Sequence, residues 1–150
     1  MIRVLIAEDS PTARALLVSI LATDPDMAVV GEAEDGMQAI RLAALRRPDV
    51  IVMDIRMPLL DGFEATKRIM ADTPTPVVIV TATAAPDDLQ VSLNALRAGA
   101  LTVLAKPAGP AAADFDDICR RFVRTVKSMA SVKVVRRWPD RISSTPAPLT

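Results

Sequence analysis

Apolar positions along the chain fall into short continuous runs that alternate, five times over, with longer segments of helical spacing. The short runs are rich in β-branched residues and are apolar throughout, which is typical of parallel strands covered by helices on both faces. The expected strands span residues 2–7, 28–31, 50–53, 77–80 and 101–105.

The first three helical segments carry clear boundary signals. Ser10 followed by Pro11 predicts a helix cap and a proline at the first helical position. The second segment, residues 37–45, follows a glycine and closes before a proline. The third begins near Phe63 and breaks at Pro74.

The last two helical segments are expected to bury leucine and aromatic stripes. The fourth starts after a proline, carries Leu89, Leu93 and Leu96 on one stripe, and ends at a glycine, which leaves Val91 off the stripe and exposed. The apolar stripe of the fifth consists of Phe115, Ile118, Cys119, Phe122, Val126 and Met129.

This alternation predicts an α/β fold. Five strand–helix units with right-handed crossovers give a (βα)₅, flavodoxin-like, doubly wound parallel sheet of strand order 2-1-3-4-5 with five helices. The pattern stops near residue 130, and the rest is rich in Pro, Ser and Thr. We therefore expect one domain at 1–130, with 131–150 as a linker or flexible tail.

Composition narrows the chemistry. The chain of 150 residues has no histidine and one cysteine, which excludes Ser-His-Asp catalysis, disulfides and His or Cys metal sites. Its 18 basic and 18 acidic residues give no argument for nucleic acid. No apolar stretch approaches the ~20 residues of a membrane span, so no membrane insertion and a cytoplasmic location are expected.

Polar residues stand where four of the predicted strands end. Glu8 and Asp9 follow the first strand, Asp54 the third, Thr81 ends the fourth, and Lys106 follows the fifth. Since the carboxyl ends of parallel strands meet at one edge, these side chains are expected to converge. Three crowded carboxylates repel one another unless cations accompany them, and an all-oxygen site favours Mg²⁺, with Mn²⁺ as a substitute.

Such a site suits phosphoryl transfer. Asp54 is the expected nucleophile, and Lys106 and the Thr81 hydroxyl are expected to hold phosphoryl oxygens. A haloacid-dehalogenase-type phosphatase is a rival interpretation, but such enzymes need an acid two positions after the nucleophile, where Arg56 stands. A flavin- or nucleotide-binding module on the same sheet would need a glycine-rich loop after a strand, and the sequence has none. A domain that only binds protein is disfavoured because Asp9, Asp54, Thr81 and Lys106 are all present.

Five blocks of the sequence, at residues 4–10, 49–58, 61–62, 80–82 and 105–107, match in order the signature blocks of a known family. On these blocks the sequence resembles the response-regulator receiver family of two-component signalling. The resemblance implies that Asp54 accepts the phosphoryl group and that Asp9 binds the metal directly. It further implies that Glu8 holds metal-bound water and that the backbone carbonyl of Arg56 is a third protein ligand.

The resemblance also assigns a switch. Thr81, Ala82 and Lys106 are its phosphoryl-binding and switch positions, and the Lys106–Pro107 bond is expected to be cis. At Val103 many members carry an aromatic that rotates inward on activation, and a valine cannot make that movement.

Within the family, the start of the chain and its basic last helix are most similar to the regulatory half of chemotaxis protein-glutamate methylesterases. This similarity implies a histidine kinase as phosphodonor, a C-terminal methylesterase domain as output and, through it, chemoreceptors. The chain itself has no Gly-x-Ser-x-Gly and no histidine, so it is expected to catalyse only its own phosphorylation and dephosphorylation. A stand-alone receiver acting on another protein is the alternative.

Overall fold

A five-stranded parallel sheet forms the centre of the molecule. The computed structural model describes residues 1–82, 89–107, 109 and 113–136. Its strand order is β2-β1-β3-β4-β5, as the sequence predicts. The observed strands are β1 (Ile2–Ala7), β2 (Met27–Ala33), β3 (Val50–Asp54), β4 (Val77–Thr81) and β5 (Thr102–Ala105).

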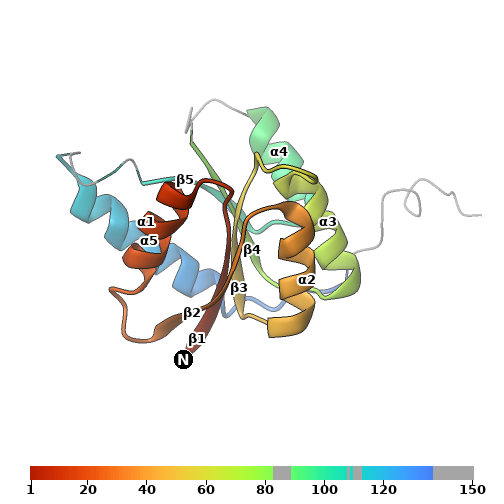
Figure 1. The fold of residues 1–150 in the computed structure, drawn as a ribbon, viewed down its shortest axis with the longest axis horizontal. Coiled ribbons are helices and arrows are strands. Elements are labelled where there is room, and N and C mark those ends of the chain that lie inside the picture. Colours follow the sequence, from red (N-terminus) through yellow and green to blue (C-terminus); the bar gives the residue numbers. More distant parts are fainter. Residues whose placement is uncertain (83–88, 108, 110–112, 137–150) are drawn as a thin grey trace, which may run out of the picture.

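Helices cover both faces of the sheet (Figure 1). Two lie on one face and three on the other, as a doubly wound sheet requires. The flavodoxin-like fold is thereby confirmed. On the first face lie α1 (Pro11–Leu21) and α5 (Phe115–Met129), and on the second lie α2 (Gly36–Arg46), α3 (Gly62–Asp72) and α4 (Leu89–Ala98).

The continuous apolar runs of the central strands are explained by burial on both faces. In β1, Val4 and Ile6 pack into the core under α1 and α5, whereas Leu5 and Ala7 pack into the core under the other three helices. The central strands β3 and β4 divide in the same way. Because neighbouring residues of a strand point to opposite faces, a strand covered twice needs apolar residues at every position.

Side-chain caps fix where three helices begin. Ser10 Oγ accepts a hydrogen bond from the Ala13 amide at 3.2 Å, which starts α1. Asp35 and Asp61 start α2 and α3 in the same way, each accepting from the amide three residues on. Since unpaired amides at a helix start favour a nearby carboxylate or hydroxyl, these caps set the helix bounds and the path of the loops before them.

The fourth helix departs from the prediction. The helical spacing predicts that Leu93 and Leu96 lie on the packed stripe, but their exposed fractions are 37% and 54%. The residues of α4 that are buried are Ala95 and Ala98, and Val91, expected to be exposed, is half-buried. Small residues let the helix lie close to the sheet, and a periodicity argument that weights leucine above alanine selects the wrong face.

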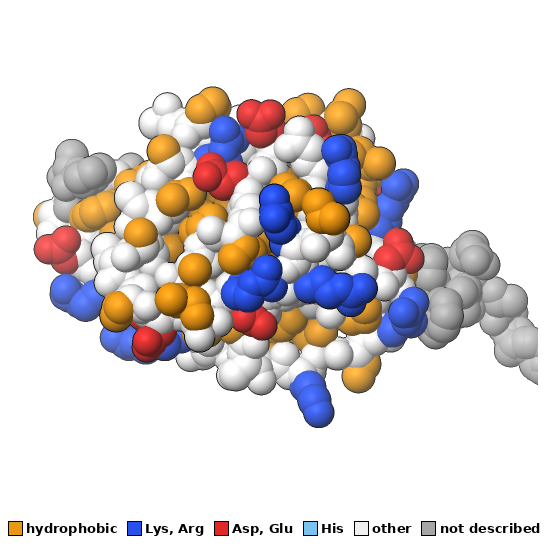
Figure 2. Space-filling view, turned by 60° about the horizontal axis from the view of Figure 1, so that its bottom comes forward, with side chains coloured by type: hydrophobic (Ala, Val, Ile, Leu, Met, Phe, Trp, Pro, Cys, Tyr) orange, Lys and Arg blue, Asp and Glu red, His pale blue; other side chains and the backbone are white. Residues whose placement is uncertain are grey.

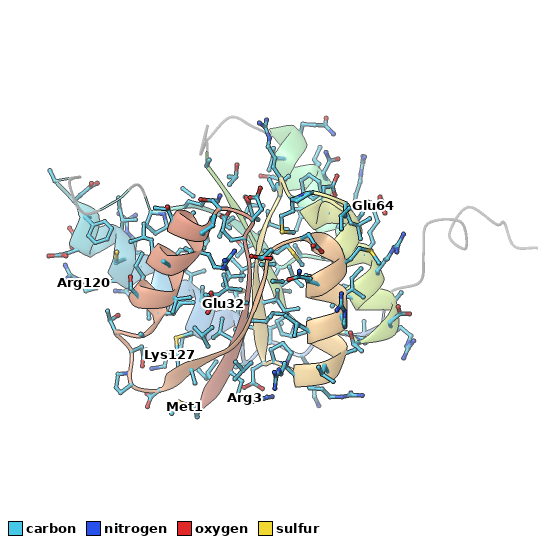
Figure 3. All side chains as sticks on the ribbon, viewed as in Figure 1. Met1, Arg3, Glu32, Glu64, Arg120 and Lys127 are labelled. Atoms are coloured by element: carbon cyan, nitrogen blue, oxygen red, sulfur yellow. The ribbon has the colours of Figure 1, made fainter. Side chains whose placement is uncertain are left out.

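An ion-pair cluster joins α5 to the connection between α1 and β2 (Figure 3). The ammonium of Lys127 lies 3.1 Å from Asp24 and 3.0 Å from Asp26. Its hydrogen bonds to Asp26 and Asp24 raise the pKa of Lys127 above its ordinary value. The amide of Asp26 and the ammonium of Lys127 lower the pKa of Asp24.

Among the described residues, no helix is both long and apolar enough to cross a membrane.

Candidate phosphoryl-acceptor site

The polar residues predicted from the strand ends do converge at the carboxyl edge of the sheet. Ligand oxygens of Glu8, Asp9 and Asp54 all lie within 4.8 Å of one another. Glu8 and Asp54 are buried, with exposed fractions of 1% and 5%, and Asp9 is exposed. Two acids are therefore shielded from water while the third opens to solvent.

Lys106 reaches into the same cluster from the end of β5. Its ammonium lies 2.6 Å from Glu8 Oε1 and 3.2 Å from Asp54 Oδ1. Burial alone lowers the pKa of Lys106, but the hydrogen bond to Glu8 and the charges of Asp54 and Glu8 outweigh this effect, so its pKa is raised. The amine is therefore a fixed cation, and it balances only one of the three acids.

Backbone amides hold the two buried carboxylates in place. The Ser10 amide donates to Glu8 Oε2 at 3.1 Å, and the Ile55 amide donates to Asp54 Oδ1 at 2.9 Å. Each acid is thus oriented by the loop that begins at its own strand end. Three oriented carboxylates with one ammonium leave an excess of negative oxygen ligands, and this donor set fits a hard divalent ion such as Mg²⁺.

An open hollow of about 530 Å³ lies beside the acids. Asp9 forms one wall, and the loop after β3 forms the rest, with Arg56 exposed at its edge. The acids can therefore be reached from solvent on this side. The lining residues are Asp9, Ile55, Arg56, Met57, Pro58, Asp61 and Phe63.

The start of α3 packs closely against the end of β3, the strand that ends in Asp54. The Gly62 amide donates to the Ile55 carbonyl at 2.8 Å. A Cβ added to Gly62 would lie 2.2 Å from the Asp54 carbonyl oxygen, closer than any side chain tolerates. Glycine is therefore required here for close approach, and α3 is in direct contact with Asp54.

The remaining predicted switch positions lie at the same edge. Thr81 ends β4 half-buried and Ala82 follows it exposed, while the Lys106 amide donates to the Thr81 carbonyl at 2.9 Å. Val103 lies in β5 opposite Ile79 and packs against the core under α2, α3 and α4. Their roles toward a phosphoryl group stay predictions.

The expected cis bond at Pro107 is wrong. No cis peptide bond occurs in the part of the chain that the structure describes, which includes Lys106 and Pro107, so the bond between them is trans. Trans is the ordinary preference of an X–Pro bond, by about 0.5–1 kcal/mol. Lys106 reaches Glu8 and Asp54 from the trans backbone.

Sequence reasoning missed Arg14, which braces the acidic loop. Its guanidinium donates to the Glu8 carbonyl at 2.8 Å and to Glu32 at 3.1 Å, and lies 3.6 Å from Glu34. It thereby ties the end of β1 to the end of β2. The available signal was its place one turn after Ser10, because helical side chains point back toward the helix start.

Comparison with known proteins decides the family. The model of the response regulator receiver domain matches residues 4–113, which include Glu8, Asp9, Asp54 and Lys106. The chain belongs to the response-regulator receiver family. The resemblance drawn from the sequence is therefore confirmed.

The relatives that match this chain are described as protein-glutamate methylesterases. This chain is 58% identical over 148 residues to protein-glutamate methylesterase/protein-glutamine glutaminase 4 of Myxococcus xanthus. It is 49% identical over 148 residues to protein-glutamate methylesterase/protein-glutamine glutaminase 1 of Syntrophus aciditrophicus. These matches cover 99% of this chain but only 41% and 42% of the relatives. The response regulator domain of Thermotoga maritima CheB superposes with a TM-score of 0.79 at 38% identity, covering 89% of this chain and 98% of that one.

Proposed function

We propose that this receiver accepts a phosphoryl group from a histidine kinase on Asp54, with Mg²⁺ bound beside it, and regulates a protein-glutamate methylesterase domain. The observation that supports this most is the convergence of Glu8, Asp9 and Asp54 around the Lys106 ammonium. In the transfer, a carboxylate oxygen of Asp54 forms a bond to phosphorus as the bond to the donor nitrogen breaks.

Different residues of the site are proposed to bind the metal and the phosphoryl group. Asp9 and Asp54 are the proposed direct metal ligands, with Glu8 acting through water and the Arg56 carbonyl completing the protein set. Bound Mg²⁺ supplies positive charge that offsets the charge on the transferring group. Lys106, already 3.2 Å from Asp54, is placed to hold one phosphoryl oxygen.

At the neighbouring strand end, the Thr81 hydroxyl and the Ala82 amide are the proposed partners of another phosphoryl oxygen. Thr81 closes β4, the strand that pairs with both β3 and β5. Charge-assisted hydrogen bonds contribute about 1.5–3 kcal/mol each. Two such bonds shift a two-state equilibrium by about a hundredfold or more, which is enough for a switch.

Intact mass spectrometry after incubation with a small acyl phosphate and Mg²⁺ tests the acceptor. The wild type is expected to gain the mass of one phosphoryl group, and Asp54→Asn to gain none. Asp61→Asn, at the rim of the same hollow, is the matched control and is expected to be labelled. Labelling of Asp54→Asn at the wild-type rate contradicts the proposal, and so does an unlabelled wild type.

The output is the second part of the proposal. The chain spans 41% of the length of its Myxococcus xanthus relative, which leaves room there for a further domain. Exposed Leu93 and Leu96 on α4 are apolar groups that a partner surface would cover. Binding of a purified methylesterase domain from that relative, measured with phosphorylated and unphosphorylated receiver, is expected to differ in affinity. Equal affinities, or no binding in either state, contradict regulation through direct contact.

A further inference from the structure

The segment after α5 crosses from one side of the sheet to the other. Helix α5 ends at Met129 on the face that it shares with α1. Seven residues later, the guanidinium of Arg136 donates to the carbonyl of Ala71, in the last turn of α3 on the opposite face. Figure 1 shows this segment passing below the strands to the lower end of α3.

The carboxyl end of α3 lacks a cation within the helix itself. The helices run antiparallel to the strands, so their carboxyl ends, where the helix dipole is negative, lie at the lower edge of the sheet. The last turns of α2, α4 and α5 contain Arg46, Arg97 and Lys127. Helices α1 and α3 have no basic residue there, and α3 ends at the acidic Asp72. Arg136 therefore brings from outside the helix the cation that its own sequence lacks.

Figure 2, in which this lower side is turned forward, shows Lys and Arg side chains gathered over it.

The sequence similarity to the methylesterase relatives extends beyond the residues that match the receiver family. That match ends at residue 113, but the Myxococcus xanthus protein aligns over 148 residues, so the alignment includes the segment after α5. The segment after α5 thus aligns with a relative that is more than twice as long as this chain.

We propose that residues 131–136 form a docked connector, fastened by Arg136 to the carboxyl end of α3. The chain then leaves the receiver beside α3 rather than beside α5. This matters for output, because α3 contacts the Asp54 backbone at its first residue, Gly62. One helix thus touches the acceptor residue at one end and the connector at the other.

Trypsin digestion of the full 150-residue chain tests the docking. Cleavage after Lys133, which lies inside the connector and is exposed, reports how often the connector opens. Arg136→Ala is expected to speed this cleavage roughly fivefold or more, because a charge-assisted hydrogen bond is lost. Arg136→Lys, which keeps a cationic donor, is expected to restore most of the protection.

Two controls separate docking from general effects. Arg137→Ala removes the same charge one position further on and is expected to leave cleavage after Lys133 at the wild-type rate. Cleavage after Arg41 in α2 reports global unfolding and serves to normalise each rate. Equal normalised rates for wild type and Arg136→Ala overturn the proposal, and so does an equal acceleration by Arg137→Ala.

Discussion

Neutralising the acceptor carboxylate tests the charge balance of the site. Asp54→Asn removes two repulsions, with Glu8 and with Asp9, and one attraction, with Lys106. At the 4.8 Å limit of the cluster, each repulsion is about 3.5 kcal/mol at an effective dielectric near 20. The attraction across 3.2 Å is about 5 kcal/mol by the same relation. The balance favours the variant by about 2 kcal/mol, and screening at the exposed Asp9 reduces this to about 1 kcal/mol.

The assay is thermal unfolding in a chelator and then with excess Mg²⁺. Without metal, Asp54→Asn is expected to melt about 3–6 °C above wild type, which corresponds to about 1 kcal/mol for a domain of this size. With Mg²⁺ the wild type gains stability and the variant gains much less, because one ligand is gone.

Asp72→Asn, at an exposed carboxylate on the far edge of the sheet, is the matched control and is expected to stay within about 0.5 kcal/mol of wild type. A variant no more stable than wild type in chelator refutes the electrostatic reasoning. Equal stabilisation of both proteins by Mg²⁺ refutes Asp54 as a ligand.

Three further predictions concern stability. A neighbouring backbone amide and, after it, the ion pairs with Lys127 lower the pKa of Asp24, and Lys127→Met loses these ion pairs. Their stabilisation is present above the ordinary pKa of 3.8 and is lost as the pH falls through the lowered pKa. In urea unfolding, the deficit in unfolding free energy of the variant is therefore expected to shrink in acid. Gly62→Ala is expected to cost about 2–4 kcal/mol in urea unfolding and to slow phosphorylation measured by mass, because its Cβ meets a backbone oxygen at 2.2 Å. Leu93→Ser combined with Leu96→Ser is expected to change the free energy of unfolding by less than about 1 kcal/mol, since both side chains are exposed. A deficit that stays constant in acid, an unperturbed glycine variant or a large loss in the serine variant contradicts the respective argument.

The sheet and its acids were predictable because local chemistry dictates them. A run such as Val50 to Met53 has no polar position to leave exposed, so it must lie between two helical layers. Once the strands are placed, topology alone brings their carboxyl ends together, and Glu8, Asp9 and Asp54 are then neighbours without any contact being known in advance.

The remaining features depend on contacts between distant segments, which periodicity does not encode. The burial of Ala95 in place of Leu93 follows from how closely α4 approaches the sheet. The bond from Arg136 to Ala71 spans 65 positions. Arg14 reaches Glu32 only because β2 is adjacent to β1. In each case the sequence contains the residue, but its partner is set by the fold.

The position of Lys106 connects the site to the proposed switch. Its ammonium lies nearer to Glu8, at 2.6 Å, than to Asp54, at 3.2 Å. Mg²⁺ bound among the acids would weaken the attraction between Glu8 and the amine. A phosphoryl group on Asp54 would add oxygens on the side toward which the amine already points. Lys106 follows β5 directly, and its amide is bonded to the end of β4. In the proposed switch, a change of partner by this side chain would therefore pull on the edge of the sheet that carries α4 with its exposed leucines.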